Sequence, residues 1–359
     1  MCYGGILNDT NRQWRFPINY KIEYKESYDY IDSAISFIAY FTCVTFKENK
    51  SLEYNQQGII FKSGDYTYSD RIGTKENNNS NIIYISHKDK YNYIVIQGLI
   101  LNALGVFPEQ TRNDRDNYVN IEQKNVKDYN KNKIYFEKNT NLTYTPIYDT
   151  QYDYGSVIKK TITAKGYYGD QYQKMMGQKK VVTFNDYKIV NRHFCKQKCN
   201  NTLYCHKNGY QNPNKCNQCI CPFPFTNNDC NGLLPNSLGS TGCPGRHVEA
   251  DRYQTYGYTI SGKKSCYGYI SAPQDRQVRF TLVFLNMAKH SVCTRGTGSV
   301  EIKYKSRKDV MGLCFCGHIP NPYKNIYTED GLIVFIYNGA SSSDRFKYEY
   351  ISAIVVNKT

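Results

Sequence analysis

The residues best suited to do chemistry in this chain are its 14 cysteines, and they are unevenly spaced. Only two precede residue 195, whereas the other 12 lie between Cys195 and Cys316. Cysteines this dense are typical of a disulfide scaffold, which forms in an oxidising compartment. Cys216 and Cys219 also have the spacing of a zinc-binding pair. In an oxidised chain we favour disulfides.

Asparagine sequons fit the same compartment, because Asn-x-Ser/Thr accepts glycans in secreted proteins. No charged-then-apolar leader follows Met1, and the longest apolar stretch, 94–107, has 14 residues. A bilayer span needs about 20 residues. We expect a secreted glycoprotein without a transmembrane segment, whose signal peptide is not part of this sequence. The glycosylation candidates are Asn8, Asn49, Asn78, Asn141, Asn200 and Asn357.

Length and charge limit the classes of function. The 359 residues predict two or three domains, and 46 Lys and Arg against 31 Asp and Glu give a net charge of +15. The basic residues are spread along the chain, which favours a solvated surface, although acidic glycans are a candidate partner. There is no basic stripe or stacking motif, so we expect no nucleic-acid partner.

Apolar patterns predict an α+β arrangement in the first half of the chain. Helical spacing over Ile31–Thr45 predicts an amphipathic helix, and Tyr93–Leu104 predicts a buried helix ended by Gly105. The apolar runs Gly58–Lys62 and Asn81–Ser86 predict short buried strands.

The second half of the chain has a different pattern. Residues 196–230 are loop-like, with Gly, Asn and Pro between cysteines. From Gly242 onward, apolar runs separated by turn residues predict an antiparallel β-sandwich. These runs are Val278–Leu285, Val300–Tyr304, Leu332–Tyr337 and Glu349–Val356.

Five motifs in residues 12–195 resemble, in order, those of the astacin metalloendopeptidases. The resemblance implies an α+β metzincin fold of the astacin peptidase type over 12–195, after an N-terminal remnant at 1–11. In the active family it also implies a zinc-dependent endopeptidase site. The motifs are Arg12–Tyr20, Thr42–Phe46, Glu109–Val119, Tyr152–Val157, and Gly177-Gln178 with Asn185-Asp186.

The family's zinc motif, His-Glu-x-x-His-x-x-Gly-x-x-His, corresponds here to residues 98–108. In the family its histidines bind zinc, and its glutamate takes a proton from zinc-bound water. The ligand positions here hold Gly98, Asn102 and Pro108, and the general-base position holds Leu99. Gly105 retains the turn of the motif. Glycine and proline offer no side-chain donor, asparagine is a poor zinc ligand, and leucine carries no proton.

The rest of the family's zinc site is altered as well. Ile158 replaces the methionine of the Met-turn, and Lys160 replaces the zinc-coordinating tyrosine. Residues 88–192 contain no histidine. We therefore expect no zinc cofactor and no functional catalytic residue. The alternative is a working zinc endopeptidase with ligands from outside the motif, such as His87 or His193.

Glu109 has two interpretations. In the family this glutamate meets the new amino terminus after the pro-segment is removed, so it is a candidate maturation switch. We favour the other interpretation, a polar residue retained for folding in a charged loop. The neighbouring charges are Arg112, Asp114, Arg115 and Asp116.

The resemblance also implies disulfides and two further modules. Family pairing gives Cys43–Cys195. Residues 196–231 resemble an EGF-like module, whose pattern gives Cys199–Cys216, Cys205–Cys219 and Cys221–Cys230. Residues 243–356 resemble a CUB domain without evident calcium ligands. There we expect Cys243–Cys266 and Cys293–Cys316, which leaves Cys2 and Cys314 unpaired.

Three functions follow from these observations. We favour an inactive astacin-type protein that binds extracellular proteins or peptides. The second hypothesis is an active zinc metalloendopeptidase that hydrolyses extracellular proteins. The third is a decaying gene copy with no selected role.

Overall fold

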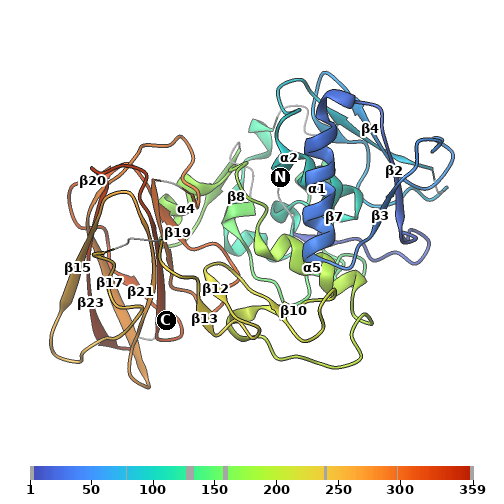
Figure 1. Ribbon diagram of the computed structural model, residues 1–359. Coiled ribbons are helices and arrows are strands. Elements are labelled where there is room, and N and C mark those ends of the chain that lie inside the picture. The colour runs from blue at the N-terminus through green and yellow to red at the C-terminus, as the bar shows by residue number, and fades with distance from the viewer. Residues whose placement is uncertain are drawn as a thin grey trace. The chain divides into compact units, whose positions relative to one another are not determined.

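The computed structural model describes residues 4–77, 79–126, 133–156, 161–237, 241–296 and 298–355 (Figure 1). Two compact units are present. Unit 1 comprises the chain up to Gly166 with residues 176–203 and 211–218, and unit 2 comprises 167–175, 204–210 and the chain from Cys219 onward. Over the described ranges, no helix has the length and hydropathy needed to cross a membrane.

Unit 1 is built on a five-stranded sheet in the order β3-β2-β4-β6-β5. The pairs β2–β3, β2–β4 and β4–β6 are parallel, and β5 runs antiparallel to β6. Parallel neighbours require crossover connections, and helix α1 lies in the one between β2 and β3. The predicted strands are confirmed at β4 and β6. The strands are β2 (Ile18–Ile22), β3 (Phe46–Glu48), β4 (Ile59–Ser63), β5 (Tyr68–Ser69) and β6 (Asn81–Ile85).

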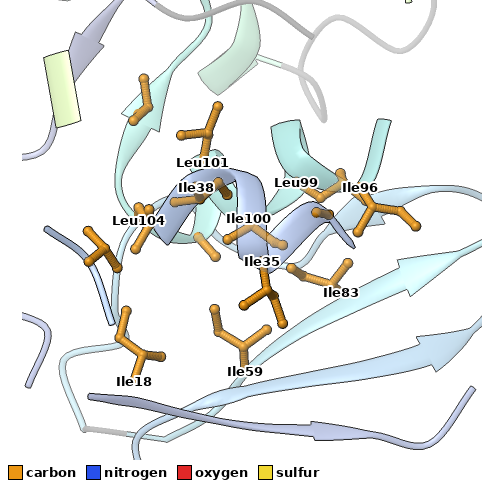
Figure 2. Close-up of a cluster of buried hydrophobic side chains, with 14 of the residues drawn as sticks. Ile18, Ile35, Ile38, Ile59, Ile83, Ile96, Leu99, Ile100, Leu101 and Leu104 are labelled. Atoms are coloured by element: carbon orange, nitrogen blue, oxygen red, sulfur yellow. The ribbon is translucent and has the colours of Figure 1, made fainter. Parts of the chain in front are cut away.

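Three helices complete the core of unit 1: α1 (Tyr28–Phe41), α2 (Tyr93–Ala103) and α5 (Phe184–Phe194). Figure 2 shows side chains of α1 and α2 packed with those of the sheet strands in one apolar cluster. The predicted buried helix is confirmed at α2. The Asn92 side chain caps its start by accepting a hydrogen bond from the N–H of Val95 (3.1 Å). Gly105 follows its end with a φ of +102°, a conformation that favours glycine.

The predicted first helix is correct in kind, but its boundaries are wrong. It begins at Tyr28 and ends at Phe41 rather than at Thr45. Thr42 has an extended backbone, and its hydroxyl donates a hydrogen bond to the carbonyl of Ile38 (2.7 Å). Cys43 is then held in a disulfide. The apolar pattern in the sequence extends past Phe41 because Val44 is also buried. Val44 lies outside the helix, so the pattern overestimated the helix length.

Smaller elements complete unit 1. Strand β1 (Gly5–Ile6) pairs with β7 (Val106–Phe107), and β8 (Val119–Ile121) pairs with β9 (Ile162–Ala164), both antiparallel. Single 3-10 turns of unit 1 lie at 25–27, 109–111, 115–117, 123–125, 133–135 and 154–156, and one of unit 2 lies at 206–208. Strand β10 (Tyr210–Gln211) begins in unit 2 and ends in unit 1, and β11 (Cys219–Ile220) belongs to unit 2.

Unit 2 contains two five-stranded sheets, ordered β14-β16-β22-β18-β19 and β15-β23-β17-β20, with β21 also paired to β17. The rings of Phe335 on β22 and Tyr348 on β23 pack together at 5.5 Å, so the sheets share a core. The sandwich prediction is confirmed except at β14, which pairs with β16 in parallel. The remaining elements are α4 (Gly169–Met175), β12 (Phe225–Thr226) and β13 (Gly232–Leu233).

Two of the four predicted apolar runs lie wholly within longer strands, β17 and β22. The other two start inside β18 and β23 and extend past the ends of these strands, at Lys303 and Ile354. The ten sandwich strands are β14 (His247–Glu249), β15 (Tyr256–Ser261), β16 (Ser265–Ser271), β17 (Arg276–Asn286), β18 (Ser299–Lys303), β19 (Leu313–Phe315), β20 (His318–Ile319), β21 (Ile326–Tyr327), β22 (Leu332–Asn338) and β23 (Arg345–Ile354).

Candidate functional site

Helix α2 carries the positions at which a zinc site would lie if the motif were intact. Leu99 is 4% exposed and packs in the core beside Ile96 and Ile100 (Figure 2). Gly98 and Pro108 are buried. Asn102 uses its amide Nδ2 to donate a hydrogen bond to the carbonyl of Val106 (2.9 Å). This set of side chains does not fit a zinc ion, because it offers one neutral amide and no imidazole or carboxylate.

The residue before Gly98 makes the main polar contact of this helix. Gln97 is fully buried, and its Oε1 accepts a hydrogen bond from the hydroxyl of Tyr187 on α5. Burial raises the pKa of Tyr187 above its ordinary value, so the hydroxyl stays protonated. The contact is a neutral hydrogen bond between two helices. Sequence reasoning missed it because neither residue belongs to a family motif.

The segments that resemble astacin motifs meet in a buried hydrogen-bonded network. Glu109 Oε1 accepts a hydrogen bond from the N–H of Asp153 (2.7 Å), and Ser156 Oγ donates to Asp186 Oδ1 (3.1 Å). Gln178 Nε2 donates to the carbonyl of Gly155 (2.8 Å). These contacts hold the 152–156 segment against the 178–186 segment and against the loop after α2. They require no metal ion.

Burial dominates the electrostatics of this network. Desolvation raises the pKa of Glu109 well above its usual range, despite the attraction of Arg112. Desolvation, followed by repulsion from Asp153, raises the pKa of Asp186 to about 7. Asp186 also accepts a hydrogen bond from the N–H of Thr183 (2.8 Å) in the capping box of α5.

The charged side chains of the loop around Arg112 have hydrogen-bond or ion-pair partners within unit 1. Arg112 is 3% exposed and donates to both carboxylate oxygens of Asp114, at 2.8 and 2.9 Å. Its Nε lies 3.8 Å from Glu109 Oε1. Arg115 bonds Asp116 (3.2 Å) and the carbonyl of Gln110 (2.7 Å). These geometries give each charge a partner, which is consistent with retention for folding.

The histidines proposed as substitute ligands lie in different settings. His87 is exposed. His193 Nδ1 shares a hydrogen bond with the hydroxyl of Tyr148 (2.9 Å), and burial, followed by repulsion from Lys196, lowers its pKa to about 4. Within the described ranges, no three His, Cys, Asp or Glu side chains are grouped so as to hold a metal ion.

Several predicted positions fall outside the described residues: Ile158 and Lys160 of the Met-turn, Cys2, and the sequons at Asn78 and Asn357. Of the remaining sequons, Asn8, Asn141 and Asn200 are exposed and Asn49 is half-buried. The amide Nδ2 of Asn8, which would accept a glycan, donates to the carbonyl of Thr143 (3.0 Å). A glycan there would displace this hydrogen bond.

Five disulfides are formed among the described residues, and all have the pairing given in the sequence analysis. One joins Cys43 to Cys195 across a separation of 152 residues in unit 1, with a Cα–Cα distance of 5.6 Å. The other four close loops of 9 to 23 residues. They are Cys199–Cys216, Cys205–Cys219, Cys221–Cys230 and Cys243–Cys266.

The expected Cys293–Cys316 bond is not formed, and this expectation is corrected. Cys293, Cys314 and Cys316 are free thiols. Cys314 Sγ lies 3.0 Å from Cys293 Sγ, so Cys314, expected to be unpaired, is in direct contact with it. Cys316, the residue after β19, also interacts with Cys293, so Cys314 and Cys316 compete for one partner.

A pocket that the sequence did not reveal opens in unit 1. Its volume is about 520 Å³, and its lining includes Trp14, Tyr148, His193 and the exposed Lys196. None of the described residues that line this pocket is among residues 98–102 of α2. The lining residues come from segments far apart in the sequence, so no local motif marks the pocket.

Comparisons with known proteins agree with this fold. Residues 6–195 match the profile of the peptidase family described as Astacin. The chain is 28% identical to zinc metalloproteinase nas-34 of Caenorhabditis elegans over 361 residues, which cover 95% of this chain and 56% of that protein. It is 31% identical to zinc metalloproteinase dpy-31 of Brugia malayi over 261 residues, covering 67% and 42% respectively.

A solved structure is also similar in part. High choriolytic enzyme 1, a hatching enzyme zinc-protease from Oryzias latipes, is 23% identical, and the match covers 48% of this chain and 86% of that one with a TM-score of 0.39. The chain spans about half the length of the curated relatives it matches. Because the profile covers more than half of the 359 residues, the chain belongs to the astacin family of peptidases.

Proposed function

We propose that this astacin-family protein does not cleave peptides and instead binds extracellular proteins or peptides. One observation carries the proposal: the zinc-motif positions of α2 hold Gly98, Leu99 and Asn102, and the leucine is part of the apolar core. A metalloendopeptidase needs ligands that hold the metal and a base that takes a proton from its water. This helix supplies neither.

The rest of the chain supports a binding role in the extracellular space. Three disulfides lie between Cys199 and Cys230, as in the proposed EGF-like module, and two sheets follow, as in the proposed CUB-like domain. Under this proposal the chain is secreted, because such disulfides persist only in oxidising surroundings. It carries no zinc and no calcium.

A cluster of exposed rings on unit 1 is the candidate contact surface, here called the aromatic face. Its members contact one another: Tyr30 and Tyr91 at 5.3 Å, and Phe37 and Tyr93 at 5.5 Å. Tyr40, further along α1, is 65% exposed. Aromatic side chains are enriched in the centres of protein interfaces, where they supply large contact area. Exposed rings that are grouped rather than scattered favour a protein partner.

The zinc content of the protein tests the loss of activity. The disulfide-intact protein is dialysed against trace zinc, its zinc per chain is measured by elemental analysis, and it is incubated with unfolded protein substrates. We expect close to zero zinc per chain. We also expect no chelator-sensitive cleavage of the substrates. One tightly bound zinc per chain would contradict the proposal, and His87→Ala and His193→Ala would then show whether these residues are ligands.

A matched pair of variants tests the aromatic face. Phe37→Ser with Tyr40→Ser removes two of its rings, whereas Tyr66→Ser removes a ring that is 78% exposed elsewhere in unit 1. Each immobilised protein is exposed to extracellular fluid, and a partner recovered with the unmodified chain is then purified and titrated. We expect the double variant to weaken binding at least tenfold and Tyr66→Ser to leave it unchanged. Equal binding of the partner by all three proteins would exclude the aromatic face as its contact surface.

A further inference from the structure

Three thiols in unit 2 are grouped around one sulfur. Cys293 is 1% exposed and Cys314 is fully buried, and their Sγ atoms lie 3.0 Å apart. A disulfide has an S–S length of about 2.05 Å, so a shift of roughly 1 Å would close this pair. Cys316 also interacts with Cys293 through its side chain. Three thiols can form one disulfide among themselves, and one sulfur is left over.

Accessibility distinguishes the two sulfurs that compete for Cys293. Cys314 lies within strand β19, paired to Glu301 of β18, and no part of it reaches solvent. Cys316 lies just after the strand and is part-exposed. A reagent from solution can therefore reach Cys316 while it cannot reach Cys314. Closing the buried pair leaves the accessible sulfur free.

A positive charge acts on Cys316. Lys174 is exposed, and its charge interacts with the Cys316 thiol. The hydrogen bond with Cys293, the backbone N–H of His290 and the charge of Lys174 lower the pKa of Cys316 to about 7, although burial opposes this. Burial raises the pKa of Cys314 above its ordinary value. The thiolate, which is the reactive form, therefore forms at Cys316.

We propose that Cys316 is a covalent attachment site for a small anionic thiol, with Cys293 and Cys314 forming the buried disulfide beside it. The co-reactant is a low-molecular-weight disulfide that carries negative charge. The charge of Lys174 favours its approach, and the part-buried position of Cys316 restricts its size. The expectation from family resemblance is different: it pairs Cys293 with Cys316.

The chemistry balances with that disulfide, RSSR, as the only oxidant. The Cys316 thiolate attacks one sulfur of RSSR, the S–S bond breaks, and RS⁻ leaves. Cys293 loses its proton to water and attacks Cys316 Sγ, which releases a second RS⁻. Cys314 then attacks Cys293 Sγ and passes its proton to the leaving sulfur of Cys316, which returns to thiolate by losing that proton to water; this exchange involves no net oxidation. A second RSSR converts Cys316 to the mixed disulfide, so two RSSR yield three RS⁻ and one retained RS group.

The number and position of retained groups test the proposal. The full chain is treated with dithiobis(nitrobenzoate), an anionic disulfide, and digested without reduction for peptide mapping. Among the cysteines from Cys195 to Cys316, we expect one retained nitrobenzoate thiol, on Cys316, and a Cys293–Cys314 bond; peptide mapping separates any group on Cys2. This result is independent of whether the purified chain starts with the buried pair reduced or oxidised.

Single variants give the decisive controls. Cys316→Ser should retain no group at Cys293 or Cys314, because the reagent cannot reach the two buried thiols that remain. Cys314→Ser should also retain none, because Cys293 then pairs with Cys316. Lys174→Gln should slow the anionic reagent roughly threefold to tenfold at low salt and leave cystamine, a cationic disulfide, no slower. A Cys293–Cys316 bond in the unmodified chain, or a group retained on Cys314, would overturn the proposal.

Discussion

The hydroxyl of Tyr187 donates a hydrogen bond to Oε1 of Gln97, and this contact joins α5 to the helix on which an active astacin carries its zinc ligands. Both side chains are buried, and the other amide atom of Gln97, Nε2, has no hydrogen-bond partner among the residues that the structure describes. Because Nε2 of Gln97 already lacks a partner, losing the hydrogen bond from Tyr187 would leave Oε1 of the same buried amide unpaired as well. The stability of unit 1 should therefore depend strongly on this hydrogen bond.

Replacing Tyr187 by Phe should therefore lower the free energy of unfolding of unit 1 by about 1–3 kcal/mol. Urea unfolding can be followed by the fluorescence of Trp14, which is the only tryptophan of the chain and is buried in this core. Gln97→Met removes the amide, so the double variant with Tyr187→Phe should recover part of the loss. An additive double variant would mean that the two residues do not interact.

Much of this architecture was predictable from local pattern. Helix α2 and strands β4 and β6 follow from continuous apolar runs. The end of α1 was not predictable in this way. Val44 continues the apolar pattern although the disulfide at Cys43 has already fixed a non-helical path.

Contacts between distant residues account for the rest. Nothing near Gln97 in the sequence indicates Tyr187, and the two meet only when α2 and α5 pack. The sequence also left the partner of Cys293 open, because Cys314 and Cys316 are two residues apart and both interact with Cys293. Family resemblance selected Cys316, whereas the fold places the sulfur of Cys314 in contact.

The carboxyl of Asp186 should lower the stability of unit 1 as the pH rises from about 4 to about 7, against an opposing rise from His193, whose pKa burial lowers to about 4. The pKa of Asp186 is about 7 in the folded chain, against an ordinary value of 3.8. Between these values the unfolded carboxyl has lost its proton while the folded one keeps it. The unfolded state then binds fewer protons, so stability decreases with pH. The total decrease from this group is up to about 4 kcal/mol.

Asp186→Asn removes this titration, so the change in its unfolding free energy from pH 4 to pH 7 should be more positive than in the unmodified chain by up to about 4 kcal/mol. The dependence should not vanish, because the pKa of Glu109 is raised in the same direction. Urea unfolding at pH 4, 5.5 and 7, read by Trp14 fluorescence, gives the comparison. Stability that rises from pH 4 to 7 in the unmodified chain, and equally in the variant, would contradict the assignment.

The Cys43–Cys195 bond should be the most stabilising disulfide by loop length. It spans 152 residues, whereas Cys199–Cys216 spans 17. In the chain-entropy model these loops contribute about 5 and about 3 kcal/mol. Replacing both cysteines of each pair by serine and measuring unfolding by Trp14 fluorescence tests the order. Equal losses from the two pairs would show that native-state strain or residual structure in the unfolded chain outweighs loop entropy.

A buried lysine of α5 should make unit 1 sensitive to the loss of Asp149. The Lys188 side chain is 0% exposed, and its ammonium lies 3.0 Å from Asp149 Oδ2. Burial alone would raise the pKa of Asp149, but Lys188 and Arg192 together lower it to about 2. Asp149→Ala removes this partner, and a buried ammonium that loses a carboxylate is strongly destabilising. Because Asp149 is 43% exposed and water screens its charge, we expect a loss of about 2–4 kcal/mol.

The control for this prediction removes the cation as well. Lys188→Met fills the same buried space without a charge, so Asp149→Ala with Lys188→Met should recover most of the stability that Asp149→Ala loses. Arg192→Gln serves as the matched exposed cation: its side chain is 40% exposed beside the same carboxylate, and its loss should cost less than about 1 kcal/mol. If the double variant is no more stable than Asp149→Ala, the buried charge of Lys188 is not the cause. The loss would then belong to the packing around Asp149 itself.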